Sequence, residues 1–506
     1  MRKLALLLAL FLLMPLAKAD TYLTDCAGLT TEGETYYLTQ DIIDSTAGIC
    51  MYITASDVIL DCQGHIIDGV DGGTGIRIES LATVRNCIIT DWSKAIQSVM
   101  DFNAQNLTIV SNGIGIECVC SLNAQDLIVM SNDVGVYFTR PAIIINSFFD
   151  NNWDINYVAT SCDSYFENVT GRDNKPILFL NYTVEIRNWK NNVSTIILCG
   201  ANNSIIDNLE ISPSRKSGGS VQIISSNNVT FSNSILKNIE RIFIRYSSNS
   251  RIYNISEVGV TLSFSNYNIL DNIRVKGSDS GFALGYSNYN NITNSVAENC
   301  TYGVYLISAS SNLLYNNLFN STNNFYFYET TFPNYWNTTR QPGTRIYSPG
   351  NEIGGNYWTN PEGNGYSDTC TDADRDGFCD DPYVLATDNV DYLALSDEYP
   401  CECTEWAAGE CYNTTHRTYT RVCTPSGCDI EIKYEEDLTC APPTLPPVHG
   451  IPLISRSLVG LVVGFGILAF MLRTLFDIRE PKKIIEYFIT LAIIVLSIIS
   501  LMVLFA

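Results

Sequence analysis

The residues best suited to chemistry are the carboxylates of a short acidic loop. The loop offers four side-chain carboxylates and one backbone carbonyl at the spacing of a calcium-binding loop: Asp372, Asp374, Asp376, Asp380 and Phe378. Alternating carboxylates can converge on one hard cation while Gly377 permits the sharp turn. Position 12 of the loop is Tyr383 instead of glutamate, and no flanking helices are indicated, so the loop is not a complete EF-hand. The spacing predicts a structural calcium site, and an acidic, solvated turn is the alternative.

Histidines are scarce, which limits transition-metal chemistry. The 3 histidines are His65, His416 and His449, whereas copper sites require imidazole, thiolate or thioether ligands. A polysaccharide lyase would need carboxylates and a basic group on one face of the molecule. Four arginines could supply the basic group, but no carboxylate cluster accompanies them in the sequence: Arg241, Arg245, Arg251 and Arg274. We therefore assign no catalytic residues and keep a polysaccharide lyase or glycoside hydrolase as an alternative.

Aromatic residues crowd the segment 325–366. Four of them could contact a glycan: Tyr335, Trp336, Tyr357 and Trp358. Sugar rings stack their apolar C–H faces on aromatic planes, and neighbouring Asn and Asp side chains can bind the hydroxyls. A hydrophobic plug over the end of the fold is the other interpretation of the same residues.

The elements that must position these residues are indicated by an internal repeat. Asn103–Leu107 returns as Asn123–Leu127, and Ser111–Ile116 returns as Ser131–Val136, in both cases 20 residues later. Further on, Ser-Asn pairs recur at intervals of 22, 17, 22 and 24 residues, each leading into a short apolar segment. Repeats of this length are typical of stacked units that bury their apolar faces only against one another.

The repeat unit is a strand unit and not a helical one. Its apolar segments are short, alternating and rich in Ile and Val, and Asn, Ser and Gly separate them. We predict an all-β fold, a parallel β-helix solenoid, in which corner asparagines form hydrogen-bonded ladders along the stack. The predicted boundaries are an N-terminal cap at 20–50, rungs at 51–330, an aromatic C-terminal cap with the calcium loop at 331–398, a Cys-rich module at 399–440 and a Pro-rich stalk at 441–456.

Both ends of the chain indicate export and anchoring. Arg2 and Lys3 precede an apolar run and a small-residue cleavage site, which predicts a signal peptide at 1–19. Residues 457–476 and 484–506 are long and apolar enough to be transmembrane helices. The loop 477–483 between them carries Arg479, Lys482 and Lys483 and is expected to be cytoplasmic. We therefore predict a protein of the cell membrane, with residues 20–450 extracellular.

An extracellular location makes disulfides and glycosylation possible. The disulfide candidates fall in the N-terminal cap, around the acidic loop and in the Cys-rich module: Cys26, Cys50, Cys370, Cys379, Cys401, Cys403, Cys411, Cys423, Cys428 and Cys440. The remaining cysteines are interpreted as buried small apolar residues, with at least one of them free or paired with another chain. The Asn-x-Ser/Thr sequons stand at Asn106, Asn168, Asn181, Asn192, Asn202, Asn228, Asn254, Asn291, Asn299, Asn320, Asn337 and Asn413.

Composition excludes one class of partner. The 506 residues include 30 Lys and Arg against 53 Asp and Glu, a formal net charge of −23. Because no basic tract offsets this excess, the chain would repel phosphate backbones, and we expect no nucleic-acid partner.

The segments 58–69, 337–339, 354–358 and 372–377, together with Cys26 and Cys50, resemble NosD-like right-handed parallel β-helix proteins from about residue 24 to 396. The resemblance implies a secreted or surface β-helix of a group associated with carbohydrate binding and sugar hydrolysis, and copper delivery is a further alternative. The Cys-rich module, with Trp406, Arg417 and Arg421, resembles a thrombospondin type 1 module.

The leading hypothesis combines these features. We expect a membrane-anchored surface β-helix that binds carbohydrate or other envelope components, or shapes the envelope, without catalytic turnover. Calcium would be its structural cofactor, and no organic cofactor is expected.

Overall fold

The computed structural model describes residues 20–440 apart from 159, 215, 217, 240, 349, 398–401, 414, 422 and 425–430. The predicted signal peptide, stalk, transmembrane helices and cytoplasmic loop lie outside the described residues. Within the described part, no helix has the length and apolar character needed to cross a bilayer.

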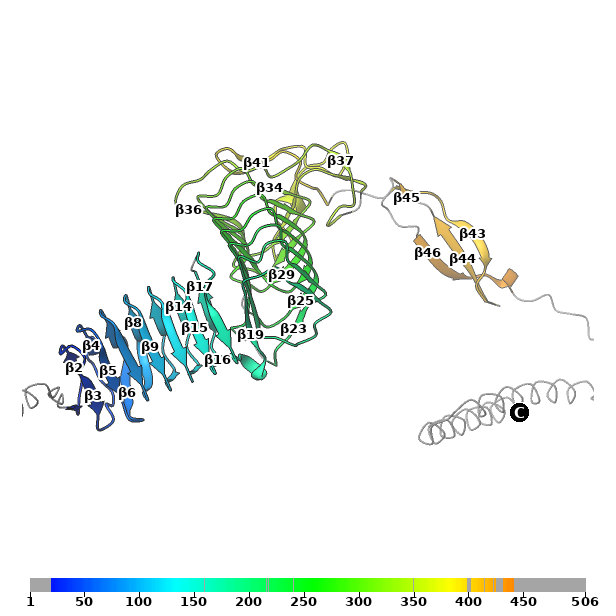
Figure 1. Ribbon diagram of the computed structural model, residues 1–506. Coiled ribbons are helices and arrows are strands. Elements are labelled where there is room, and N and C mark those ends of the chain that lie inside the picture. Colours follow the sequence, from blue (N-terminus) through cyan, green and yellow to red (C-terminus); the bar gives the residue numbers. More distant parts are fainter. Residues whose placement is uncertain are drawn as a thin grey trace, which may run out of the picture. The chain divides into compact units, whose positions relative to one another are not determined.

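Two stacks of parallel coils make up the main body (Figure 1). In the first stack, one sheet has eight strands, and we call it sheet A: β1 (Thr21–Leu23), β3 (Thr35–Leu38), β5 (Val58–Asp61), β7 (Ala82–Arg85), β9 (Phe102–Gln105), β12 (Leu122–Gln125), β15 (Ala142–Ile145) and β18 (Tyr165–Glu167). Its companion, sheet B, has ten: β2 (Ala27–Leu29), β4 (Ile49–Ile53), β6 (Ile66–Ile78), β8 (Ile88–Ser98), β10 (Thr108–Val110), β11 (Ile114–Cys118), β13 (Ile128–Met130), β14 (Val134–Phe138), β16 (Phe148–Asp150) and β17 (Trp153–Tyr157).

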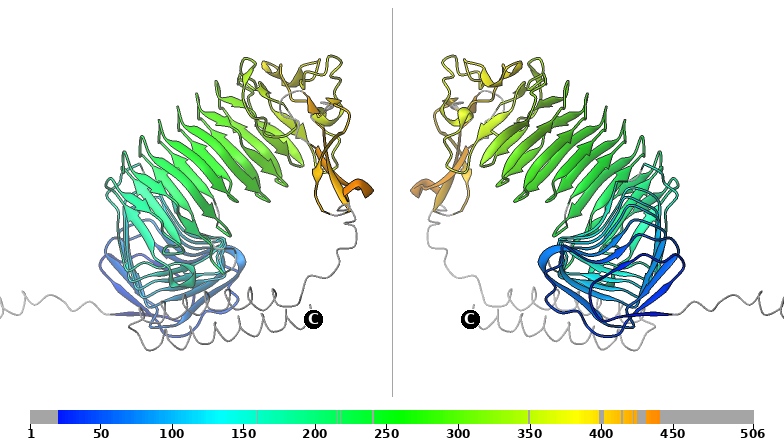
Figure 2. Two further views of the ribbon diagram at one scale, coloured as in Figure 1. Left: turned by 90° about the vertical axis from the view of Figure 1, so that its right-hand side faces the viewer. Right: turned by 90° about the vertical axis from the view of Figure 1, so that its left-hand side faces the viewer.

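The second stack repeats this plan, and Figure 2 shows its strands (green) side by side as successive coils. Sheet C has eight strands: β19 (Ile177–Leu180), β21 (Thr195–Cys199), β24 (Val221–Ile224), β26 (Ile242–Arg245), β28 (Val260–Ser263), β30 (Ser280–Gly285), β33 (Tyr302–Ile307) and β36 (Asn323–Tyr328). Sheet D has eleven: β20 (Glu185–Arg187), β22 (Ile205–Asp207), β23 (Glu210–Ile211), β25 (Thr230–Leu236), β27 (Arg251–Ser256), β29 (Ile269–Lys276), β31 (Asn291–Thr293), β32 (Val296–Glu298), β34 (Leu313–Tyr315), β35 (Leu318–Asn320) and β39 (Tyr357–Thr359). The predicted parallel β-solenoid is confirmed.

The register of the coils follows the sequence repeat. Asn103 pairs with Asn123, and Ala104 pairs with Ala124, so residues 20 apart lie one above the other. The first coils begin at β1, because β1 and β3 already pair in parallel within sheet A. Residues 20–50, predicted as a cap, therefore form part of the solenoid itself.

Buried asparagine ladders run through the corners, as predicted. Asn268 donates to Asn290 Oδ1 at 3.1 Å, and Asn290 donates in turn to Asn312 Oδ1 at 3.0 Å. Each side chain also donates to backbone carbonyls, as Asn290 Nδ2 does to Ser265 O at 2.9 Å. The ladders satisfy polar groups that would otherwise be buried without partners.

The two stacks meet at the end of the first stack, where its hydrophobic core would otherwise be exposed to solvent. Ile197, Cys199 and Ile224, on sheet C, belong to the hydrophobic core cluster of the first stack. The ring of Trp153 stacks on Phe243 with centroids 4.7 Å apart. Sheet C thus covers the end of the first stack, which removes an exposed sheet end.

Polar contacts complete this junction. Gln222 Nε2 donates to Ile155 O at 2.6 Å. Arg245 Nη1 donates to Asn156 Oδ1 at 3.0 Å and to Tyr157 O at 2.6 Å. These bonds tie two backbone carbonyls and one side-chain amide of β17, the last strand of sheet B, to the side of the second stack.

A cap of short elements follows the last coil. It contains β37 (Gln341–Pro342) paired with β38 (Glu352–Ile353), α2 (Tyr366–Thr369), and β40 (Tyr383–Ala386) paired with β41 (Asn389–Asp391). One short helix, η1 (Arg172–Asn174), precedes the second stack, and another, η2 (Leu438–Cys440), ends the described chain.

The Cys-rich module contains a three-stranded sheet of β43 (Ala407–Cys411), β44 (His416–Arg421) and β46 (Glu431–Glu436), and a pair formed by β42 (Glu402–Cys403) and β45 (Cys423–Thr424). In the three-stranded part, Lys433 Nζ lies 4.4 Å from the centre of the Trp406 ring. Arg417 forms an ion pair with Asp437 at 2.6 Å.

Three disulfides join six of the candidate cysteines: Cys26–Cys50, Cys370–Cys379 and Cys411–Cys440. The predicted Cys401 and Cys428 lie outside the described residues, as do the side chains of Cys403 and Cys423. Six further cysteines were interpreted as buried apolar residues, which is wrong, because they form three disulfides: Cys62–Cys87, Cys118–Cys120 and Cys162–Cys199. Among the described cysteines, Cys300 is free and buried.

Candidate functional site

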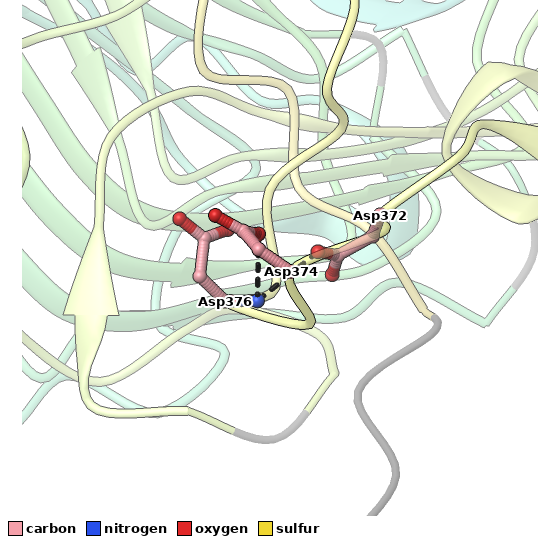
Figure 3. Close-up of side chains that lie close together, drawn as sticks. All are labelled: Asp372, Asp374 and Asp376. Carbon is pink, nitrogen blue, oxygen red and sulfur yellow. Dashed lines mark hydrogen bonds between the residues drawn. The ribbon is translucent and has the colours of Figure 1, made fainter.

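The acidic loop lies between α2 and β40, and the Cys370–Cys379 disulfide closes it at its base. Oxygen atoms of Asp372, Asp374 and Asp376 lie within 4.8 Å of one another, and Figure 3 shows the three side chains gathered on one turn. The structure therefore brings together three of the predicted calcium ligands.

The turn is organised by Asp372. This side chain is only 3% exposed; its two carboxylate oxygens accept hydrogen bonds from Asp376 N at 3.0 Å and Gly377 N at 2.8 Å. Gly377 has φ +84°, which a residue with a Cβ adopts only with strain. These bonds turn the chain so that alternate carboxylates meet.

Charge accumulates in the loop. Burial raises the pKa of Asp372, and the charges of Asp376 and Asp374 add to the rise, while the two backbone N–H donors lower it. A bound divalent cation would reverse the repulsion among the three carboxylates. An all-oxygen donor set of this kind suits a hard cation such as calcium.

Two arginines neutralise part of this charge. Arg340 forms an ion pair with Asp376 and a second one with Glu352 at 2.6 Å. Arg345 donates to Gly377 O at 2.7 Å and to Asp376 O at 3.0 Å. A cation would therefore share Asp376 with Arg340, which limits its affinity for the loop.

The remaining predicted ligands have other contacts. Asp380 Oδ2 accepts a hydrogen bond from Ala373 N at 3.0 Å and is not part of the group of three. The ring of Phe378 is buried, and both arginine side chains lie over it, with Arg345 4.6 Å and Arg340 4.7 Å from its centre. A ligand role for the Phe378 carbonyl stays a prediction.

Three of the four aromatic residues expected to contact a glycan are buried in the cap. Trp336, Tyr357 and Trp358 are fully buried. The Trp336 and Trp358 indoles donate to Asn389 Oδ1 at 3.0 Å and Asp391 Oδ2 at 2.8 Å. The glycan assignment of these three is wrong because their rings plug the last coil; Tyr335 is 63% exposed.

Exposed aromatic ladders occur instead at the corner that follows sheet C. Tyr246, Phe264 and Tyr286 stack on successive coils, with centroids 5.3 and 4.9 Å apart and planes within 10° of parallel. Three residues further along the same corner, Tyr267 stacks on Tyr289 at 5.1 Å. All five rings are exposed.

Both ladders end on the same coil. The next coil has Ser308 and Ser311 where Tyr286 and Tyr289 stand, as the bond from Tyr286 N to Ile307 O shows. One face of each terminal ring is therefore not covered by a further aromatic ring. We call Tyr286, Tyr289 and these two serines the aromatic ledge.

The sequence contains a signal for the ledge. Phe264-Ser-Asn-Tyr267 and Tyr286-Ser-Asn-Tyr289 are the same pattern one coil apart. The Ser-Asn pairs indicated the coils, but the flanking rings were not interpreted as an exposed site. A corner asparagine completes the surface: Asn288 Oδ1 accepts hydrogen bonds from Ser310 N at 2.8 Å and Ser310 Oγ at 2.9 Å.

Residues considered for catalysis have structural contacts. His65 Nδ1 lies 2.9 Å from Asp41 Oδ1 in a solvent-accessible pair. Arg241 donates to Thr261 Oγ1 at 2.8 Å and to Ser280 O at 2.7 Å. Arg245 is held in the junction between the stacks.

Comparison with known families agrees with the fold. Residues 181–363 match the family model described as periplasmic copper-binding protein (NosD). No curated protein matches the chain. The match and the parallel solenoid confirm the NosD-like resemblance. Within the described residues, the three loop aspartates are the one group of three or more His, Cys, Asp or Glu side chains that lie close enough together to hold a metal ion, and their oxygens are donors typical of calcium or magnesium sites.

Proposed function

We propose that this protein is an exported β-solenoid that binds neutral glycans at the aromatic ledge without chemical turnover. The apolar segments 457–476 and 484–506 would anchor it in the cell membrane. The periplasmic description of the matched family supports export, and six disulfides among the described residues are typical of an oxidising compartment.

The single observation that carries this proposal is the pair of uncovered ring faces. Tyr286 and Tyr289 are 50% and 54% exposed, so each leaves apolar ring area in contact with solvent. The ladders below hold both rings in fixed planes, so little side-chain entropy remains to be lost on binding. A pyranose ring can stack there while Asn288 and the ledge serines bind its hydroxyls.

The proposal that the protein does not cleave the glycan rests on the side chains at the aromatic ledge. Among the described residues of the corner 286–291 and its neighbour 308–313 there is no carboxylate and no basic side chain. Glycoside hydrolysis requires a pair of carboxyl groups flanking the bond. The cation loop would then act in stability, holding the cap over the second stack.

Binding of the purified full-length protein to immobilised neutral polysaccharides tests the proposal. Loss of two stacking rings in Tyr286→Ala/Tyr289→Ala should weaken binding at least about tenfold, since one aromatic contact contributes about 0.5–1.5 kcal/mol beyond its buried area. Tyr182→Ala is the control, because it removes a ring that is 60% exposed and belongs to neither ladder. Equal binding by the double variant and the wild type, or release of reducing ends, would contradict the proposal.

A further inference from the structure

A groove, distinct from the aromatic ledge, lies on the outer face of sheet A. It has a volume of about 560 Å³ and extends over the coils containing β5, β7, β9, β12 and β15. Because it crosses successive strands near their first residues, its long direction follows the axis of the stack. We call it the sheet A groove.

The floor of the groove is a short amide ladder. Asn123 Nδ2 donates to Asn103 Oδ1 at 2.9 Å, and Asn103 Nδ2 donates to Thr83 Oγ1 at 3.3 Å. An amide nitrogen has two N–H groups and an amide oxygen has two lone pairs, so each side chain keeps bonding capacity toward solvent. These groups recur with the strand spacing of about 4.8 Å.

The sides of the groove combine apolar and acidic groups. Leu81 and Ile143 are exposed at opposite ends of the ladder. Three exposed carboxylates also line it, those of Asp57, Asp101 and Asp163, and none of the described lining residues is basic. The groove therefore attracts cations and repels anionic polymers.

The spacing of the carboxylates indicates whether the ligand of the groove is a single small cation or a polymer. Val58 pairs with Ala82 and Ala82 with Phe102, so Asp57 and Asp101 are two coils apart, or about 10 Å. Asp101 and Asp163 are three coils apart by the same reasoning, or about 14 Å. These separations are too long for one metal ion and exceed those of a hydrolase carboxyl pair, which reach about 9.5 Å.

We propose that the sheet A groove binds a linear oligosaccharide that carries protonated amino groups, lying along the axis of the stack. The amines would pair with the spaced carboxylates, the amide ladder would bind hydroxyls, and Leu81 and Ile143 would contact the C–H faces of the sugars. A basic peptide would pair with the carboxylates but would not form hydrogen bonds with the amide ladder. An extended peptide backbone pairs with the edge strand of a sheet and not with side chains across the face of a sheet.

Glucosamine oligomers, their N-acetylated forms and galacturonate oligomers are the probes for the full-length protein. We expect the glucosamine oligomers to bind, the N-acetylated forms to bind several-fold more weakly, and galacturonate not to bind. Asp101→Asn/Asp163→Asn should weaken glucosamine binding about fivefold, as expected for two solvent-exposed ion pairs. Asn123→Ala should weaken it further without changing its dependence on salt.

The matched control is Asp126→Asn/Asp133→Asn, which removes two exposed carboxylates of the same stack outside the groove. This control should bind like the wild type. Equal weakening in both double variants, displacement by lysine oligomers at the same charge concentration, or no glucosamine binding would overturn the inference. Because Tyr286→Ala/Tyr289→Ala leaves the groove intact, failure at one site is distinguishable from failure at the other.

Discussion

A buried carboxyl group at the junction of the two stacks makes stability depend on pH. Asp154, on β17, is fully buried. Its Oδ1 accepts hydrogen bonds from Asn151 N at 2.7 Å and Asn151 Nδ2 at 3.2 Å. Among the described residues, its Oδ2 has no hydrogen-bond partner. Burial, with the nearby Asp150 charge, raises the pKa of Asp154 from 3.8 to about 7.

The sign and size of the effect follow from this shift. The folded state binds the proton of Asp154 more tightly than the unfolded state does, so the contribution of Asp154 to stability is most favourable below about pH 4 and falls as pH rises to about 7. The rise of the Asp154 pKa from 3.8 to about 7 corresponds to at most about 4 kcal/mol. Asp154→Asn removes the charge and keeps the acceptor for Asn151. The variant should therefore be more stable than the wild type at pH 8 and similar to it at pH 4.

Thermal unfolding of the full-length protein between pH 4 and pH 8 measures this difference. We expect the midpoint of the variant to exceed that of the wild type increasingly as pH rises. Asp133→Asn, an exposed carboxylate on the same stack, is the control and should change the midpoint little at any pH. A wild-type midpoint that exceeds the Asp154→Asn midpoint at pH 8 would refute the reasoning.

Three further predictions concern the ladders and the cation loop. Asn290→Ala removes one member of a buried ladder and should lower stability by about 2–3 kcal/mol, because its buried partners lose their hydrogen bonds. Asn272→Ala, in an exposed ladder, should lower stability by less than about 1 kcal/mol. Thermal or denaturant unfolding measures both changes. Millimolar calcium should raise the unfolding midpoint of the cap, and Asp372→Asn or a chelator should abolish that rise; a midpoint indifferent to both would exclude a structural calcium site. Gly377→Ala should destabilise the cap, because the residue has φ +84° and a Cβ would collide with the Arg345 guanidinium, and an unchanged midpoint would contradict the loop geometry.

Much of the solenoid could be predicted because its contacts repeat in the sequence. Residues 20 apart, such as Asn103 and Asn123, are also neighbours in space, so the repeat length directly reports the coil. The corner asparagines could be assigned to ladders for the same reason. Asparagines of the exposed ladders have a left-handed backbone, as at Asn254 with φ +56°, a conformation that asparagine tolerates better than most residues.

Features without a repeat could not be predicted. The junction joins Arg245 to Tyr157 and Gln222 to Ile155, and no periodic pattern relates residues so far apart in sequence. The sequence alternation at Tyr335-Trp336 does not show which of the two rings faces inward. Trp336 faces inward because β41 lies over the last coil, where Asn389 accepts a hydrogen bond from its indole. Cys62 and Cys87 stand on adjacent coils, a relation that required the exact coil length at that point.

Hydroxyl-radical footprinting of the full-length protein, with and without a bound neutral oligosaccharide, tests glycan binding at the ledge most directly, because it reports the solvent exposure of individual side chains. Oxidation of Tyr286 and Tyr289 should fall on binding, while that of Tyr246 and Tyr182, which are exposed elsewhere, should not change. Undiminished oxidation of both ledge tyrosines at saturating oligosaccharide would contradict the proposed function.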